Sequence, residues 1–179
     1  MTLRDALIQL RAFARIDGIY MALLWTLSFG SIIFFPESMW GTMLAIATPF
    51  LAGVRLRVFR DYALDGIISL RRAYAYLWYV FFYASLIFAA IQLLYFLFLD
   101  HGTFMAMITA ACNTVIQMYR AQNMPTQELT EALQAIRQTP ASVLPFTFMG
   151  QNMLIGAIIS LPIAAVMRRT GTPRPNVNK

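Results

Sequence analysis

The sequence contains four long runs of apolar residues, and these runs limit the chain to a small set of folds. Residues 77–99, the longest run, include no charged side chain, and the other runs cover residues 19–35, 39–54 and 146–167. A helix needs about 20 apolar residues to cross the roughly 30 Å hydrocarbon layer of a membrane. We therefore predict an all-α, polytopic membrane protein with four transmembrane helices, in which residues 1–179 form a single integral membrane domain.

The composition excludes most other classes of protein. Hydrophobic residues make up 59% of the chain and charged residues 12%, against about 25% charged residues in an ordinary soluble domain. A soluble domain of 179 residues could not bury so much apolar surface. A disordered chain or a nucleic-acid-binding domain would be far more polar. The single cysteine, Cys112, allows no disulfide within the chain.

The basic residues are divided unequally between the two sides of the predicted membrane. Three precede the first span, five lie between the second and third spans, and four follow the fourth span, whereas two lie between the third and fourth spans. Because Lys and Arg concentrate on the cytoplasmic side, we expect both termini to be cytoplasmic. The inner residues are Arg4, Arg11, Arg15, Arg55, Arg57, Arg60, Arg71, Arg72, Arg168, Arg169, Arg174 and Lys179, and the outer ones are Arg120 and Arg137.

Two segments outside the spans are predicted to form amphipathic helices. Before the first span, three arginines share one helical face, which is typical of a helix on the inner membrane surface; the opposite face holds Leu3, Leu7, Leu10 and Phe13. The outer segment, about residues 103–138, has a helical pattern interrupted at Asn123-Met124-Pro125. We expect two short outer-side helices here. The alternative is that residues 104–122 form a re-entrant or fifth spanning segment.

The loop between the second and third spans combines arginines with Asp61 and Asp65. Local charge pairing is the simpler explanation for this pattern, and a surface that binds an anionic lipid head group or a partner is the alternative. Arg55 and Arg57 are expected to extend from the end of the second span toward the interface. The candidate lipid- or partner-binding residues are Arg55, Arg57, Arg60, Arg71 and Arg72.

Small residues recur at four-residue spacing in three of the predicted spans, which indicates close packing between helices. Pro49 and Pro162 are predicted to kink their helices. The candidate packing positions are Gly18, Ala22 and Gly30 in or next to the first span, Gly41, Ala45 and Gly53 in the second, and Gly156, Ser160 and Ala164 in the fourth.

Few polar side chains lie within the predicted spans. Gln92 in the third span and Gln151 and Asn152 in the fourth are candidates for intramembrane polar contacts, which would be either hydrogen bonds between helices or a polar translocation path. Asp17 is expected at the inner boundary of the first span. No ionisable residue is then placed in mid-span, which argues against a pump or a coupled carrier.

No set of residues predicts catalysis. His101, the only histidine, follows Asp100, but adjacent residues on a helix do not face each other. No Cys/His cluster has the spacing of a metal site. We therefore predict a protein that is not an enzyme and that has no catalytic residue, metal or cofactor.

Several short patterns resemble a known family of bacterial membrane proteins. They are Phe59-Arg60-Asp61, Gly66-Ile67-Ile68-Ser69, Arg72-Ala73-Tyr74, Tyr95-Phe96, Met124-Pro125-Thr126, Thr139-Pro140 and residues 152–161. On these patterns the chain resembles the family called domain of unknown function 4199. The resemblance implies a four-span protein of the bacterial inner membrane with an outer helical segment, and it transfers no catalytic residue. It also suggests a polyprenyl-phosphate glycosyltransferase as a partner.

Two classes of function fit these observations. The first, which we favour, is a non-enzymatic inner-membrane protein that acts as a scaffold or accessory subunit in cell-envelope biogenesis. Its partners would be membrane lipid and either a membrane protein or a second copy of the chain, with no nucleic acid. The alternative is a small transporter or lipid-handling protein that uses the inner basic loop and the polar residues of the third and fourth spans.

Overall fold

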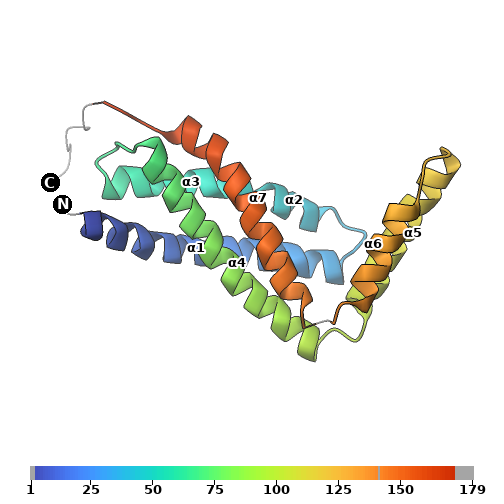
Figure 1. Ribbon diagram of the computed structural model, residues 1–179. Coiled ribbons are helices and arrows are strands. Elements are labelled where there is room, and N and C mark those ends of the chain that lie inside the picture. The colour runs from blue at the N-terminus through green and yellow to red at the C-terminus, as the bar shows by residue number, and fades with distance from the viewer. Residues whose placement is uncertain (1–2, 141, 172–179) are drawn as a thin grey trace. The chain divides into compact units, whose positions relative to one another are not determined.

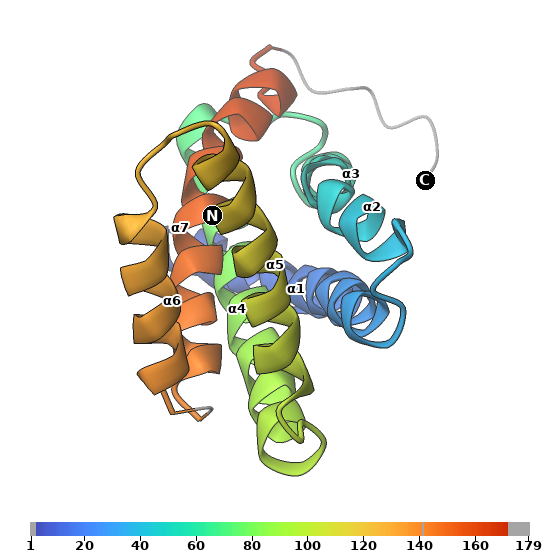
Figure 2. The same cartoon turned by 90° about the vertical axis from the view of Figure 1, so that its right-hand side faces the viewer.

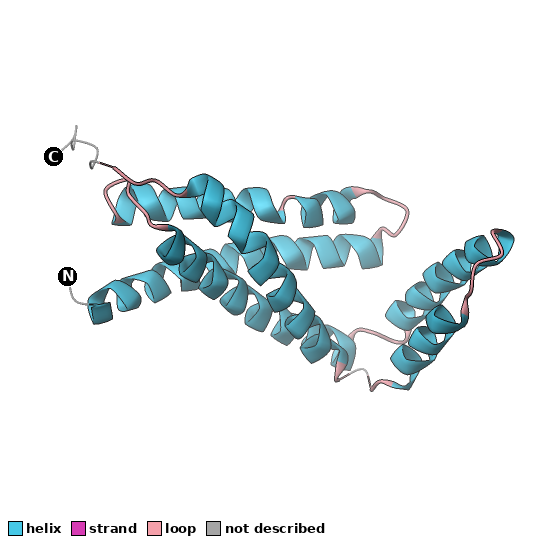
Figure 3. Ribbon diagram, turned by 45° about the horizontal axis from the view of Figure 1, so that its top comes forward, coloured by secondary structure: helices cyan, strands magenta, loops and turns pink. Residues whose placement is uncertain are grey.

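The computed structural model describes residues 3–140 and 142–171, and within them the chain forms seven helices and no strand. The tail residues Arg174 and Lys179 and the side chain of Leu3 lie outside what is described. The all-α prediction is confirmed (Figures 1 and 3). The helices are α1 (Leu3–Phe34), α2 (Trp40–Ile46), α3 (Thr48–Ala63), α4 (Leu70–Phe98), α5 (Thr103–Ala121), α6 (Gln127–Gln138) and α7 (Leu144–Met167).

Four helical segments are long and apolar enough to cross a membrane, which confirms the predicted number of membrane helices. They are Leu7–Phe34 in α1, Trp40–Ala63 over α2 and α3, Leu70–Phe98 in α4, and Leu144–Met167 in α7. The first three extend several residues beyond the apolar runs that predicted them, because the helices continue through the flanking polar residues, and the fourth begins two residues before its run. α5 is not among these four segments.

The chain divides into two compact units, and each is described by itself. The bundle unit contains the described parts of residues 1–89 and 148–179, and the hairpin unit contains residues 90–147. The bundle unit therefore holds α1, α2, α3, most of α4 and most of α7. The hairpin unit holds α5, α6 and the adjoining ends of α4 and α7.

The N-terminal arm is not the separate surface helix that its amphipathic pattern predicted, because α1 continues through it without a break. Leu10 is buried in the core of the bundle unit, and Phe13 packs on Phe59 of α3 with 5.4 Å between ring centroids. Arg11 donates a hydrogen bond of 3.0 Å to the hydroxyl of Tyr79 on α4. Part of the apolar stripe that indicated a membrane surface is therefore used for packing against α3 and α4.

The second membrane segment is interrupted between α2 and α3, as Pro49 predicts. Pro49 has no N–H to donate to the carbonyl one turn earlier, and Ala47 separates the two helices. The indole nitrogen of Trp25 on α1 donates a hydrogen bond of 3.0 Å to the hydroxyl of Thr48, the first residue of α3. The break is thereby tied to α1. Pro162, by contrast, lies within α7, which continues through it as a helix.

Glycines stand where α4 contacts two other helices of the bundle unit. A Cβ added to Gly18 of α1 would lie 2.7 Å from the Cβ of Tyr83 on α4. A Cβ added to Gly156 of α7 would lie 2.5 Å from Cγ of Phe81, also on α4. Both distances are too short for any real side chain, so the backbones approach this closely only because glycine stands there.

Two further glycines stand where the α2–α3 segment contacts its neighbours. Gly41 of α2 is buried against α1, where its carbonyl accepts a hydrogen bond of 2.7 Å from the hydroxyl of Ser28. Gly53 of α3 faces the end of α7, and a Cβ added there would lie 3.3 Å from Cε of Met167. Figures 1 and 2 show α1 beside the α2–α3 segment. Each of these four contacts in the bundle unit thus contains a glycine.

The other predicted packing positions do not all lie at contacts. Ala22, Ser160 and Ala164 are buried, but nothing lies within 4 Å of a Cβ added to Gly30, and Ala45 is exposed. A four-residue repeat advances about 40° beyond a full helical turn at each step, so the small-residue face has rotated away from α4 by the time α1 reaches Gly30. Ala45 lies just before the end of α2, where the segment breaks.

Asp65 and Gly66 form the turn between α3 and α4. Gly66 has a φ of 82°, which glycine adopts without strain. The hydroxyl of Ser69 accepts a hydrogen bond of 3.4 Å from the backbone N–H of Arg72, as expected of the residue that caps α4. Ile68 and Arg169 exchange two backbone hydrogen bonds of 3.0 and 3.1 Å. The turn is therefore joined to the segment that follows α7.

The hairpin unit consists mainly of α5 and α6, which pack side by side and are joined by a short turn (Figures 1 and 3). Asn123 in this turn has a φ of 54°, so the helical pattern breaks where predicted. At the start of α5, a carboxylate oxygen of Asp100 accepts a hydrogen bond of 3.0 Å from the backbone N–H of Phe104. Phe104 packs on Phe96 with 5.0 Å between ring centroids.

The glycine contacts generate a prediction with a control in the same helix. We expect Gly156→Ala to lower the free energy of unfolding by about 1–3 kcal/mol, because the new methyl group collides with Phe81. Gly150, also in α7, has nothing within 4 Å of an added Cβ. Gly150→Ala should therefore be neutral or stabilising by up to about 1 kcal/mol. Melting curves in mild detergent measure both effects, and equal melting temperatures would contradict the assigned contact.

Candidate functional site

A carboxylate is buried inside the bundle unit. Asp17 lies near the middle of α1, and 1% of its surface is exposed. An ionised carboxylate removed from water costs several kcal/mol unless opposite charge and hydrogen bonds replace its hydration. The groups that surround Asp17 therefore decide whether the bundle unit is stable with this residue in place.

Both oxygens of Asp17 have strong donors. The Nε of Arg55, on α3, donates a hydrogen bond of 2.5 Å to Oδ1, and a second guanidinium nitrogen forms an ion pair with the same oxygen. The hydroxyl of Tyr76, on α4, donates to Oδ2. Three helices thus meet at one carboxylate, and we call these three residues the Asp17 cluster.

Aromatic rings complete the surroundings of the Asp17 cluster. The guanidinium carbon of Arg55 lies 4.7 Å from the centroid of the Tyr20 ring, within the range of a cation–π contact. The ring of Phe59 stacks on Tyr76, with 4.3 Å between centroids and 2° between planes. The cation is therefore held between a carboxylate and a ring face, and the phenol that binds the carboxylate is itself fixed by stacking.

The Asp17 cluster contains contacts that the sequence did not predict. Asp17, expected at the inner boundary of the first span, is buried between helices, and Arg55, expected to extend toward the interface, binds its carboxylate. The sequence contained one usable signal, since Asp17 directly precedes Gly18, the first of the small residues that predict a helix contact. A charged residue next to such a stripe requires a partner on another helix, but the stripe does not identify that partner.

The other four arginines of the candidate surface have different surroundings. Arg60 pairs with Asp61 at 2.8 Å and donates to the backbone carbonyl of Met167, 3.1 Å away, at the end of α7. Arg57 is exposed and lies 3.7 Å from the same carboxylate. Local charge pairing, the simpler of the two explanations, describes these residues, which lie in the last turns of α3 and not in a loop. Arg72 donates to the side chain of Gln9 at 3.3 Å, and Arg71 is exposed.

The candidate intramembrane polar residues lie in unlike surroundings. Gln92, in the α4 portion of the hairpin unit, is 3% exposed, and its Oε1 has no hydrogen-bond partner among the described residues. Gln151 is exposed and Asn152 is half-buried, both on α7. Ser85, which the sequence analysis did not single out, is fully buried on α4 with an unpaired hydroxyl. These residues show no hydrogen-bonded path.

Asp100 and His101 do not act on each other. Asp100 accepts a hydrogen bond of 3.3 Å from the hydroxyl of Tyr95, besides the one from the start of α5. His101 is exposed, and its Nδ1 lies 3.0 Å from the backbone carbonyl oxygen of Leu99. Within the described parts of the chain, no three His, Cys, Asp or Glu side chains come together as a metal ion would need.

The arrangement of the Asp17 cluster is suited to holding helices together. Its carboxylate, guanidinium and phenol satisfy one another inside a packed bundle. Removing one member of a buried ion pair is strongly destabilising, because the other charge is left without compensation. The cluster therefore fixes α1, α3 and α4 relative to one another within the bundle unit.

This role predicts how substitutions at the Asp17 cluster combine. We expect Arg55→Gln to lower the free energy of unfolding by about 3–5 kcal/mol, because it leaves the Asp17 carboxylate buried without its cation. Asp17→Asn should cost less, because the Arg55 side chain is 26% exposed and can reach water. The double variant should be more stable than the sum of the two single losses predicts.

A nearby arginine supplies the control for this measurement. Arg57 lies on the same helix, but its side chain is 67% exposed and its ion pair is long. Arg57→Gln should change the free energy of unfolding by less than about 1 kcal/mol. Unfolding curves in mild detergent give all four values. If Arg55→Gln and Arg57→Gln behave alike, the Asp17 cluster does not hold the bundle unit together.

The chain matches the model of one protein family over residues 16–169, a range that includes the whole Asp17 cluster. That family is described as a protein of unknown function (DUF4199). A comparison with the curated proteins gives no match, and neither does a comparison with the solved structures. Since the match covers most of the chain, as the resemblance of its sequence patterns implied, this protein belongs to the DUF4199 family of proteins of unknown function.

Proposed function

We propose that this protein is a non-enzymatic accessory subunit that holds a membrane-protein partner in the bacterial inner membrane and serves cell-envelope biogenesis. The observation that carries the proposal is an apolar surface on the hairpin unit, on a helix that is not among the span-like segments. We call this surface the apolar face of α5. It consists of Val115, Met118 and Tyr119, whose exposed fractions are 39%, 59% and 38%.

The apolar face of α5 is not needed for the contact between α5 and α6. That contact uses the side of α5 that carries Ile116, which is 8% exposed. Helical periodicity places Ile116 about 160° from Met118 and about 100° from Val115, whereas Tyr119, about 60° away, stands at the edge between the two sides. Exposed apolar groups gathered on one helical face are typical of a surface that binds another protein or a membrane.

The bundle unit gives a second reason to propose that this protein holds a partner and does not transport a substrate. The buried ionisable groups of the Asp17 cluster are bound to each other, as suits a unit that keeps one arrangement. A small transporter or lipid-handling protein, the alternative, would use the inner arginines and the polar residues of α4 and α7. Arg57 and Arg60 of that set are already paired with Asp61, which favours the accessory role.

The proposed topology has both termini in the cytoplasm. The even number of span-like segments supports it, together with the unequal distribution of basic residues. A reporter that is active only outside the cytoplasm should be inactive when fused after Lys179 and active when inserted within residues 123–140. Activity of the reporter after Lys179 would exclude this orientation.

The partner is tested by mild-detergent purification from native membranes. We expect a stoichiometric membrane protein to accompany the wild type, and the family resemblance makes a polyprenyl-phosphate glycosyltransferase the first candidate. Changing Val115, Met118 and Tyr119 together to serine should release it, because the apolar contact area is lost. The fraction of partner retained on the affinity column is the measured quantity.

A second triple variant controls for the number of changes. Gln127, Glu131 and Gln138 are exposed polar residues of α6, and their replacement by serine should leave the partner bound. His101→Ala should complement a deletion strain as well as the wild type does, because the proposed role needs no acid or base. Loss of complementation by His101→Ala with normal folding would contradict the non-enzymatic role. A monomer that carries only lipid would favour the lipid-handling alternative.

A further inference from the structure

A groove of about 310 Å³ runs between α5 and α6. All the residues that line it belong to the hairpin unit, and it lies on the side of α5 away from the apolar face. Its floor is apolar, since Ile116 of α5 and Leu133 of α6 are 8% and 6% exposed. The remaining lining residues are polar or positively charged, and none is acidic.

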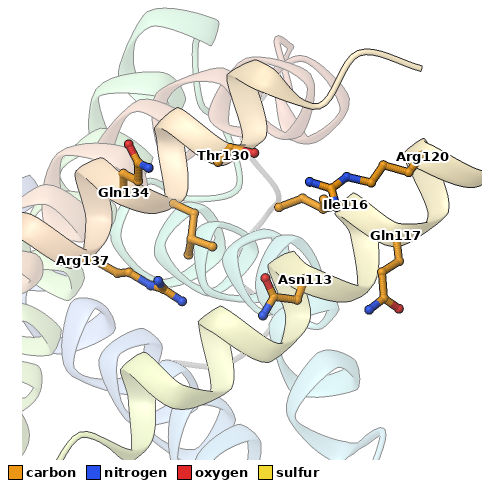
Figure 4. Close-up of a pocket in the computed structure, with 8 residues that line it drawn as sticks. Asn113, Ile116, Gln117, Arg120, Thr130, Gln134 and Arg137 are labelled. Atoms are coloured by element: carbon orange, nitrogen blue, oxygen red, sulfur yellow. The ribbon is translucent and has the colours of Figure 1, made fainter. Parts of the chain in front are cut away.

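The groove is lined by both basic residues of the hairpin unit, one toward each end. Arg120 stands in the last turn of α5 and Arg137 in the last turn of α6, and both line the groove. Figure 4 shows Arg137 and Asn113 directed toward each other from the two helices, and Arg120 extending toward the helix that carries Thr130. Each end of the groove therefore combines a guanidinium with a neutral polar side chain.

The two guanidiniums are not used by the fold. Within the described residues, the ion pairs involve Arg55, Arg57 and Arg60, and the guanidinium groups of Arg120 and Arg137 form no hydrogen bond or ion pair. Favourable interaction with a helix dipole accounts for a cation in the last turn of a helix. It does not account for two such cations lining the same groove, nor for the neutral donors beside them.

The chemistry of this groove selects an anion. A guanidinium offers a planar fork of donors that matches phosphate or carboxylate oxygens, and it stays charged at all physiological pH values. Asn113 and Thr130 can donate further hydrogen bonds. Asn113 and Arg120 are two helical turns apart, a rise of about 10 Å, so the donors occupy an extended strip. A phosphate-bearing group, with oxygens directed several ways, can engage both ends better than a single carboxylate can.

We infer that the groove between α5 and α6 is a binding site for a phosphate-bearing anion, held by Arg120 and Arg137 with Asn113 and Thr130 at its ends. The anion is either the head group of an anionic lipid or a soluble phosphate compound, since both present the same chemistry. This site does not depend on the protein partner proposed above, because it uses the other side of α5.

The test uses the full chain purified in a neutral detergent and two probes. Sodium pyrophosphate, followed by isothermal titration calorimetry, represents a soluble phosphate compound. Phosphatidylglycerol, followed by native mass spectrometry with phosphatidylcholine as the zwitterionic comparison, represents a lipid head group. We expect saturable binding of at least one probe. The double variant Arg120→Gln/Arg137→Gln should weaken that binding by about tenfold or more, because both charge-assisted contacts are lost.

A matched variant separates the groove from the overall charge. Arg15→Gln/Arg168→Gln also removes two positive charges, from exposed positions in the bundle unit, and should bind the probe as the wild type does. Arg120→Lys/Arg137→Lys keeps the charge without the planar fork and should give an intermediate affinity. Circular dichroism melting of each variant shows whether it is folded, and the single Arg→Gln variants replace the double variant if that unfolds.

Each outcome decides the assignment. Groove-dependent binding of pyrophosphate alone assigns a soluble phosphate compound, and groove-dependent binding of phosphatidylglycerol alone assigns a lipid head group. Binding of both supports the shared chemistry. Absence of saturable binding by either probe overturns the inference. Equal binding by the Arg120→Gln/Arg137→Gln variant and the Arg15→Gln/Arg168→Gln variant also overturns it, because the basic groove would then play no special part.

Discussion

The burial of the Asp17 carboxylate sets the condition that the rest of the bundle unit has to meet. A charge without water needs both an opposite charge and hydrogen bonds, and a single helix cannot supply them. Arg55 of α3 and Tyr76 of α4 do so. The positions of three helices are therefore linked through one residue, and the packing around it, including the stacking of Phe59 on Tyr76, has to keep those distances short.

The glycines make these short distances achievable. Gly18 follows Asp17 directly, and it lets α1 approach α4 until an added Cβ would collide with Tyr83. Apolar surface alone gives little reason for helices to associate in a membrane, because lipid is equally apolar. Close backbone contact at glycine and the polar contacts of Asp17 therefore act together along α1. The first increases dispersion between the helices, and the second specifies which faces meet.

Most of the helices could be predicted from the sequence because long apolar runs and turn residues act locally. The Asp65-Gly66 turn and the break at Pro49 follow from the backbone preferences of single residues. The ion pair of Asp17 could not be predicted in this way, because Arg55 is 38 positions away along the chain. The same reason explains Gly30, since a small residue identifies a helix contact only if another helix is present on its side.

Arginines inside and outside the bundle unit differ in how far their donors are satisfied. Arg55 binds a buried carboxylate, and Arg60 binds both a carboxylate and the carbonyl at the end of α7. The guanidinium donors of these side chains hold helices together, so a ligand would have to compete with the fold for those donors. Arg120 and Arg137 line a groove whose packing contact is made by Ile116 and Leu133. Their donors are available without any cost to the hairpin, and this separation of packing from charge makes the groove suited to binding an anion.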